Sequence, residues 1–230
     1  MKFTWLLFDA DNTLLDFNSA SHQAFQQNCI DFNIPYSPTT YPTYKKINTA
    51  VWTAFEQGKI TAEKLRIQRM ALFLEAIQRT DIDPQRFSIG YIDNMIINSN
   101  LYTGVRELLE NLQQKYRLSI VTNGLKEAQR PRLARLHLFP YFESVVVSDE
   151  IGVAKPAKAF FDYVYWTIPN PPPKSEILMI GDSLHSDIAG GKNFGIQTCW
   201  INHGKENETS IRPDFEIRDV LGLKEVLSLQ

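Results

Sequence analysis

Two carboxylates near the N-terminus, Asp9 and Asp11, follow the apolar run Trp5-Leu6-Leu7-Phe8. A short apolar run of this kind is typical of a buried parallel strand. Both carboxylates would then emerge at the carboxyl end of that strand and point into one crevice, where they need a counter-charge. The pattern Asp-x-Asp-x-Thr also suits a turn that merely ends a strand. The motif alone therefore leaves both interpretations open.

Three later apolar runs also end in polar groups. The second run is followed by Thr122, Asn123 and Gly124, which offer a hydroxyl and backbone N–H groups at the start of a helix, a combination that suits a phosphate oxygen. Lys155 follows the third run in a loop punctuated by glycine and proline. Taken singly, Thr122-Asn123-Gly124 is an ordinary turn composition, and a lone lysine such as Lys155 is ordinarily solvated.

Two more carboxylates, Asp182 and Asp187, lie across the turn that follows the fourth run, although Asp187 could instead serve the first turn of a helix. The carboxyl ends of parallel strands meet at one edge of a sheet, so all these groups should gather there. The sequence thus predicts one site built from Asp9, Asp11, Thr122, Lys155, Asp182 and Asp187.

Alternating strands and helices must position these groups. The predicted strands are Trp5–Ala10, Leu118–Asn123, Ser144–Ser148, Ile177–Asp182 and Gln197–Asn202. The helical patterns in this part of the chain are Gly104–Tyr116, Glu127–Leu136, Ala157–Thr167, Ser186–Phe194 and Leu221–Leu229. This alternation predicts an α/β fold with a Rossmann-like, doubly wound parallel sheet and helices on both faces.

The interval between the first two strands contains only helical patterns and is too long for one crossover. The candidate helices are Ala20–Phe32, Thr40–Gln57, Ala62–Gln78 and Pro84–Ile97. We expect residues 16–99 to form an all-helical cap domain inserted after the first strand, with residues 1–15 and 100–230 forming the catalytic core. The loops of the cap would lie over the carboxyl ends of the strands.

Composition restricts the partners and the compartment. The 230 residues are 43% hydrophobic and 22% charged, which favours a globular chain over a disordered or membrane one. The net charge of −2 provides no broad basic field, so we expect no nucleic-acid partner and a small phosphorylated ligand held locally. No apolar stretch reaches the roughly 18 residues of a membrane span. We therefore expect a cytoplasmic protein without a membrane partner; its oligomeric state cannot be read from the sequence.

In this order, the four motifs resemble those of the haloacid dehalogenase superfamily of phosphohydrolases. Asp9-Ala10-Asp11-Asn12-Thr13-Leu14 is similar to its first motif, Thr122 to its second, Lys155 with Pro156 to its third, and Gly181-Asp182 with Asp187 to its fourth. The helical insert resembles the first type of cap in this family. Finer details, including Thr122-Asn123-Gly124 and Gly152-Val153-Ala154-Lys155-Pro156, are most similar to the branch of pyrimidine 5'-nucleotidases.

The resemblance implies a magnesium-dependent phosphomonoester hydrolase. Asp9 would be the nucleophile that forms an aspartyl-phosphate, and Asp11 the acid and base. Mg²⁺ would be held by the Asp9 and Asp182 carboxylates and by the backbone carbonyl of Asp11, with Asp187 orienting metal-bound waters. The substrate implied is a small phosphorylated metabolite, in particular a pyrimidine nucleoside monophosphate.

The remaining roles concern phosphate and the cap. Thr122, Asn123 and Lys155 would bind the phosphate oxygens, and Lys155 would also help to keep Asp9 ionised. Four cap residues are candidates for contact with the substrate: Phe17, Trp52, Lys59 and Arg69. The aromatic residues of the cap, at helical spacing, suit its own core as well as a base. The four histidines show no metal-binding spacing and are interpreted as surface or loop residues.

Other functions remain open at this point. A dehalogenase of the same fold lacks an acid at the position of Asp11, which argues against that activity. A phosphatase acting on phosphoglycolate or a sugar phosphate, or a phosphomutase, would need the same four motifs. Outside the enzymes, a phospho-accepting or ligand-binding module would place similar groups around magnesium, but such receiver modules are shorter and carry no helical insert.

Overall fold

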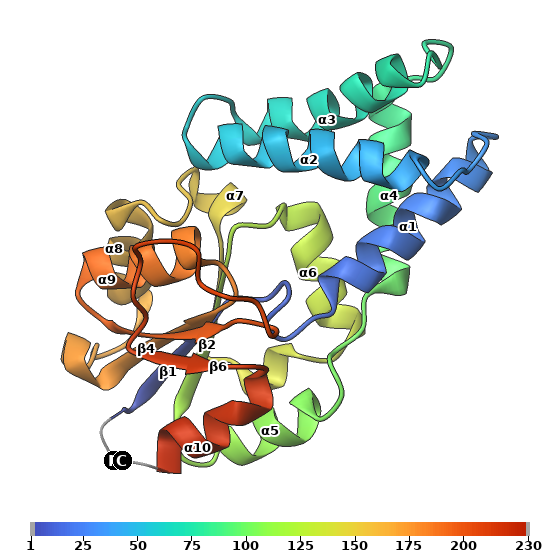
Figure 1. The fold of residues 1–230 in the computed structure, drawn as a ribbon. Coiled ribbons are helices and arrows are strands. Elements are labelled where there is room, and N and C mark those ends of the chain that lie inside the picture. Colours follow the sequence, from blue (N-terminus) through green and yellow to red (C-terminus); the bar gives the residue numbers. More distant parts are fainter. Residues whose placement is uncertain (1–2, 229–230) are drawn as a thin grey trace. The chain divides into compact units, whose positions relative to one another are not determined.

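The computed structural model describes residues 3–228, which form two compact units (Figure 1). The first unit contains the chain up to Asp16, then Asn100–Gln129 and the chain from Leu133 onward. The second contains Phe17–Ser99 with Arg130–Arg132. The functional division of residues 1–15, 16–99 and 100–230 into a catalytic core and a cap stays a prediction.

The first unit is built on a six-stranded sheet in the order β3-β2-β1-β4-β5-β6, with every neighbouring pair parallel. Its strands are β1 Trp5–Phe8, β2 Arg117–Thr122, β3 Ser144–Val147, β4 Ile177–Gly181, β5 Gln197–Ile201 and β6 Phe215–Ile217. β1 lies in the middle, with Phe8 in register with Ile120 of β2 and Ile180 of β4. The predicted α/β fold and its five strands are confirmed.

Successive residues of β1 face two separate hydrophobic clusters, which explains why the strand is apolar without alternation. Leu6 and Phe8 pack in the cluster of helices α5 and α10, whereas Trp5 and Leu7 pack in the cluster of α8 and α9. The helices and helical turns of this unit are α5 Val105–Leu112, α6 Lys126–Arg135, η1 Phe139–Tyr141, α7 Ser148–Ile151, α8 Lys158–Thr167, η2 Lys174–Glu176, η3 Leu184–Ala189, α9 Gly190–Phe194, η4 Val220–Gly222 and α10 Leu223–Ser228. The sheet is thus covered on both faces, as predicted.

Some element boundaries differ from those expected. The helix predicted over Ser186–Phe194 is divided into η3, which has π-helical hydrogen bonding, and the α-helix α9. The helix predicted over Leu221–Leu229 becomes a short 3-10 turn and α10, and Leu229 lies outside the described residues. The sequence analysis missed α7 and β6, which are four and three residues long.

The second unit contains the four helices predicted for it (Figure 1). They are α1 Phe17–Asp31, α2 Thr40–Glu56, α3 Ala62–Ala76 and α4 Pro84–Asn98. Two of them begin at capping side chains, because Thr61 accepts from the Lys64 N–H and Asp83 accepts from the Gln85 N–H. Within the described residues, none of the helices has the length and apolar character needed to cross a membrane.

Candidate active site

The first motif forms a tight loop directly after β1. The Asp9 N–H donates to Ile180 O at 2.9 Å, so the pairing of β1 with β4 continues to the nucleophile candidate. The chain then turns back, because Leu14 N and Leu15 N both donate to Ala10 O, and Asn12 adopts a left-handed conformation with φ of 54°. This turn leaves Asp9 and Asp11 at the carboxyl end of the central strand, as predicted for them.

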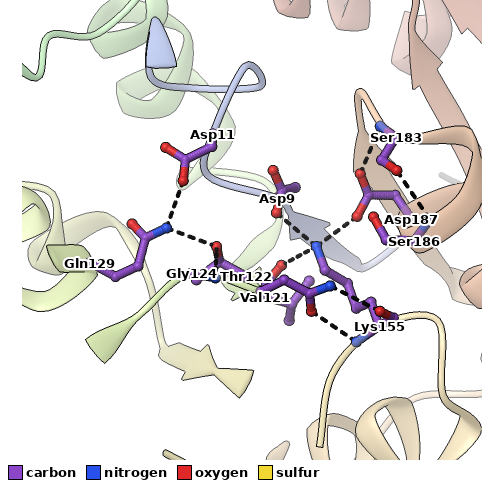
Figure 2. Close-up of polar contacts among 11 residues, drawn as sticks. Asp9, Asp11, Val121, Thr122, Gly124, Gln129, Lys155, Ser183, Ser186 and Asp187 are labelled. Carbon is purple, nitrogen blue, oxygen red and sulfur yellow. Dashed lines mark hydrogen bonds and ion pairs between the residues drawn. The ribbon is translucent and has the colours of Figure 1, made fainter. Parts of the chain in front are cut away.

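Lys155 is the buried cation of the site. Its side chain is 1% exposed, and its ammonium donates to Asp9 Oδ1 at 2.7 Å, to Asp187 Oδ1 at 2.6 Å and to Val121 O at 2.7 Å (Figure 2). An ammonium has three hydrogens, so these three acceptors account for all of them. The interpretation of Lys155 as a solvated lysine is therefore wrong, and its placement with Asp9 and Asp187 agrees with the predicted site.

Asn123 fixes the loop that carries this lysine. The Asn123 side chain donates from Nδ2 to Lys155 O at 2.9 Å and accepts from Lys155 N at 2.8 Å. This reciprocal pair ties the end of β2 to the loop after α7. The structure thus gives the Asn123 side chain a role in positioning Lys155, while the predicted contact of phosphate with backbone N–H groups near Asn123 stays a prediction.

Three carboxylates of the site lie close enough to share a cation. Asp9, Asp182 and Asp187 each offer one carboxylate oxygen, and these oxygens all lie within 4.8 Å of one another. Trp200 Nε1 donates to Asp182 O at 2.9 Å and so fixes the backbone of that ligand candidate. This cluster holds three carboxylates, and Lys155 pairs with only two of them, Asp9 and Asp187, so the carboxylates outnumber their buried cation.

Burial and the neighbouring charges shift the pKa values of two of these carboxylates, Asp9 and Asp182. Burial raises the pKa of Asp9 well above its ordinary value; Lys155 lowers it, and the neighbouring carboxylates raise it further. Burial, followed by the charge of Asp187, raises the pKa of Asp182 to about 7. The charge of Lys155 thus favours the ionised form of Asp9, in the direction expected, while burial and the neighbouring carboxylates oppose it. A divalent cation would stabilise both carboxylates, and all-oxygen donors are those that Mg²⁺ prefers, so these residues fit that ion.

The Asp187 side chain is held firmly by its surroundings. Its Oδ1 accepts from Lys155 and its Oδ2 accepts from Ser183 N at 3.0 Å (Figure 2). A Cβ on Gly181 would lie 2.2 Å from Asp187 Oδ2, so only glycine allows the carboxylate to approach the end of β4 this closely. Because both oxygens already accept hydrogen bonds, Asp187 suits the supporting role predicted for it.

Asp11 and Thr122 are joined by a residue that the sequence analysis missed. Gln129, in the first half of α6, donates from Nε2 to Asp11 Oδ2 at 2.8 Å and to Thr122 Oγ1 at 3.1 Å (Figure 2). Thr122 Oγ1 also accepts from Gly124 N at 3.3 Å. A signal was available, because a polar residue in the early turns of a helix that starts at a strand end lies beside that end.

His203 was also missed as a neighbour of the site. Its Nε2 lies 2.6 Å from Asn12 O, and its ring lies 5.6 Å from that of Tyr102. The residue is half-buried and contacts the loop that carries Asp11, although it was interpreted as a surface or loop histidine. No spacing in the sequence indicates this contact, which depends on the path of the chain after β5.

The four candidate substrate residues of the cap differ in burial. Lys59 is exposed and lines a hollow with Thr61 and Glu63, whereas Phe17 and Trp52 are half-buried. Arg69 is buried at 4% exposure. Its Nη1 donates to Asn48 Oδ1 at 3.3 Å, and its guanidinium lies 5.2 Å from the centre of the Tyr91 ring. Contact of any of the four candidates with substrate stays a prediction.

The sequence was compared with known families and relatives. The profile of the family described as "Haloacid dehalogenase-like hydrolase" matches residues 6–201. The chain is 33% identical over 228 residues to the pyrimidine 5'-nucleotidase YjjG of Escherichia coli, covering 99% of each chain. It is 34% identical over 219 residues to the pyrimidine 5'-nucleotidase PynA of Streptococcus pneumoniae, covering 94% of this chain and 92% of that one.

A solved structure is similar over the full fold. The protein YfnB of Bacillus subtilis, solved bound to magnesium, matches with a TM-score of 0.92 and 36% sequence identity. The match covers 99% of this chain and 100% of that one. The similarity to known proteins therefore extends over nearly the whole chain.

Proposed function

Since the chain belongs to the haloacid dehalogenase-like hydrolase family and is a phosphoric monoester hydrolase, we propose that it is a magnesium-dependent 5'-nucleotidase acting on pyrimidine nucleoside monophosphates. The observation that carries the reaction type is the Lys155 ammonium, which joins Asp9 to Asp187 at the carboxyl ends of the strands. The printed names of YjjG and PynA support the nucleotide as substrate, since both are called pyrimidine 5'-nucleotidases.

In the first half of the reaction, an Asp9 carboxylate oxygen attacks phosphorus in line and forms an aspartyl-phosphate. The bond from phosphorus to the ester oxygen breaks, and Asp11 gives a proton to that leaving oxygen. In the second half, Asp11 takes a proton from a water molecule, which attacks the aspartyl-phosphate at phosphorus. Inorganic phosphate leaves and the Asp9 carboxylate is restored.

Positive charge and hydrogen-bond donors would hold the phosphate during both halves. The Thr122 hydroxyl and the backbone N–H groups near Asn123 would donate to the oxygens that do not react, and Lys155 would contribute its positive charge beside them. The carboxylates of Asp9 and Asp182 and the Asp11 carbonyl would hold Mg²⁺, with Asp187 in support. When bound, the ion would reduce the repulsion between the anionic phosphate and the anionic nucleophile.

We assign recognition of the pyrimidine ring of the substrate to the cap. Phe17 and Trp52 are the candidates for stacking on a pyrimidine ring, and Lys59 and Arg69 are candidates for polar contact with the substrate. The cytoplasm remains the compartment that we predict for this activity.

Phosphate release from a panel of substrates at millimolar Mg²⁺ tests the proposal. The panel contains UMP, dTMP, purine nucleoside monophosphates, a hexose phosphate and phosphoglycolate, and we expect the highest kcat/KM with UMP or dTMP. Asp9→Asn serves as the control that removes the nucleophile. A higher kcat/KM with a sugar phosphate would contradict the nucleotidase assignment, and an isomerised hexose phosphate would indicate a mutase.

A further inference from the structure

The Gln129 amide is buried between two groups of the active site. The residue is 1% exposed, and its Nε2 donates to Asp11 Oδ2 and to Thr122 Oγ1 (Figure 2). A primary amide nitrogen carries two hydrogens, so each of these acceptors takes one. The side chain therefore links the acid–base candidate on the β1 loop to the phosphate-binding candidate at the end of β2.

The contacts of the Thr122 hydroxyl determine where its hydrogen points. A hydroxyl oxygen has two lone pairs, and here one accepts from Gln129 and the other from the Gly124 N–H. Thr122 is 1% exposed, and in the part of the chain that the structure describes no acceptor takes the hydrogen of this hydroxyl. The hydrogen must therefore point away from both donors.

We propose that Gln129 is a positioning residue that makes the Thr122 hydroxyl an obligatory donor to a phosphate oxygen of the substrate and holds it at a fixed distance from Asp11. This inference rests on the proposed phosphatase function. Gln129 itself does not touch the substrate; it acts by occupying a lone pair of the Thr122 hydroxyl and one oxygen of the Asp11 carboxylate. Precise placement of such groups is worth up to about a hundredfold in rate.

Gly124 provides the space that this arrangement needs. A Cβ at position 124 would lie 2.1 Å from Gln129 Nε2 and 2.5 Å from its Cγ, far inside van der Waals contact. Position 124 therefore requires glycine, because the Gln129 side chain occupies the space that a Cβ would take. This contact also offers a way to displace Gln129 without altering Asp11, Thr122 or Gln129 itself.

The first test measures turnover of p-nitrophenyl phosphate and inhibition by inorganic phosphate. Gln129→Ala should lower kcat by about 10- to 100-fold and raise the inhibition constant of phosphate by roughly tenfold. Gln129→Glu keeps the shape but has no N–H to donate, so it should be at least as impaired as Gln129→Ala. Circular dichroism and the melting temperature establish that each variant is folded.

A double-mutant cycle separates positioning from a general structural role. In a Thr122→Val background, Gln129→Ala should leave the phosphate inhibition constant unchanged, because no hydroxyl remains to be oriented. In a Thr122→Ser background, which keeps the hydroxyl, the roughly tenfold effect of Gln129→Ala should return. The same tenfold change in all three backgrounds would contradict the proposal.

A second cycle uses the glycine. Gly124→Ala alone should impair kcat about as much as Gln129→Ala, and the double variant should be no worse than Gln129→Ala. If Gln129→Ala lowers only the melting temperature, with kcat and the phosphate inhibition constant unchanged, the proposal is wrong. A folded wild-type protein that hydrolyses no phosphomonoester would instead overturn the proposed function, so the two failures are distinguishable.

Discussion

At the scale of single residues, the charge balance around Lys155 determines what the site can do. One ammonium serves the buried carboxylates of Asp9 and Asp187, and burial would lower the pKa of Lys155 if those two acids did not raise it more strongly. The lysine therefore stays charged, and it joins the end of β1 to η3. Its removal would leave both acids without their shared partner.

Replacement of Lys155 by Met keeps the length of the side chain and removes the charge. Because two buried carboxylates lose their counter-charge, we expect the free energy of unfolding in chelator to fall by about 3–5 kcal/mol. Loss of this positive charge beside the reacting phosphate should also reduce kcat by about 10²- to 10³-fold. Urea unfolding and phosphate release measure the two effects.

Lys158→Met is the matched control, because Lys158 pairs with Asp162 on the surface at 2.7 Å and is 64% exposed. Such exposed pairs contribute about 0.3–0.5 kcal/mol, so this variant should remain close to wild type in stability and rate. Equal losses for Lys155→Met and Lys158→Met would show that burial of the Lys155 contacts has no energetic consequence.

Sequence reasoning identified most of these residues but not their contacts. Asp9, Asp11 and Lys155 could be placed because each follows an apolar run, and strand order brings their backbones to one edge. The burial of Lys155 could not be predicted, since a lysine in a loop is ordinarily solvated. The position of Gln129 early in its helix indicates that it lies near the strand end, but no pattern of residue types indicates that its amide contacts Thr122 in the space left by Gly124.

At the scale of elements, the edge strand β6 is held by one side chain as well as by its backbone. Asp214, just before β6, accepts from Thr198 N at 2.9 Å, from Thr198 Oγ1 at 3.0 Å and from Lys192 Nζ at 2.7 Å. Burial would raise the pKa of Asp214, but the hydrogen bonds from Lys192 and Thr198 outweigh that effect and lower it. The carboxylate thus anchors β6 to β5.

Asp214→Asn should destabilise the protein by about 1–2 kcal/mol at pH 7, because the charged acceptor is lost. A lowered carboxyl pKa in the folded state stabilises the protein above the ordinary value of 3.8, and that contribution disappears as the pH falls through the folded pKa. The difference in melting temperature between wild type and variant should therefore be constant from pH 7 to 5 and shrink in more acidic solution.

Asp93, which is exposed on α4, supplies the control for this experiment. Asp93→Asn should leave the melting temperature within experimental error of wild type throughout the pH range. A difference between wild type and Asp214→Asn that grows on acidification would contradict the assigned direction of the pKa shift.

The longer elements were predictable and the short ones were not. β1, β2, β4 and β5 are buried almost throughout because both faces of the sheet are covered, and their mostly apolar residues make them visible in the sequence. β6 has only Phe215, Glu216 and Ile217, and its middle residue is exposed. With neither a run nor an alternation of sufficient length, such an edge strand has no pattern of its own.

At the scale of the whole molecule, the acidic cluster lies entirely within the first compact unit. The repulsion among its carboxylates opposes the folded state, so a bound cation should stabilise that unit. The stretch from 16 to 99 shows only helical periodicity, while strands recur on both sides of it, and this pattern predicts where the helices of the second unit lie. The function of that unit as a cap, and which of its residues contact substrate, stay predictions, because periodicity does not determine side-chain placement.

Addition of millimolar MgCl₂ to protein stripped with chelator should raise the melting temperature. At a concentration 100 times the dissociation constant, a ligand that binds only the folded state contributes about 2.7 kcal/mol. For a chain of this length, that corresponds to roughly 5–10 °C. Differential scanning fluorimetry with increasing MgCl₂ measures the shift.

Two variants define the origin of that shift. Asp182→Asn removes a proposed ligand and should abolish the magnesium-dependent increase, whereas Asp162→Asn, far from the cluster in sequence and partly exposed on α8, should keep it. An equal increase in both variants would mean that magnesium stabilises the protein somewhere other than at Asp182.

The most direct measurement concerns the covalent step at Asp9. Wild-type enzyme is mixed with UMP carrying ³²P in its phosphate and quenched in acid during turnover. One portion is digested and its labelled peptide is identified. A second portion is reduced with borohydride, which converts an aspartyl-phosphate to homoserine and releases the phosphate, and is then mapped by peptide mass spectrometry. We predict transient label on the peptide that contains Asp9, borohydride conversion of that residue alone, and no label in Asp9→Asn. Release of labelled phosphate at full rate without any labelled protein, or label on a different residue, would contradict the assignment of Asp9 as nucleophile.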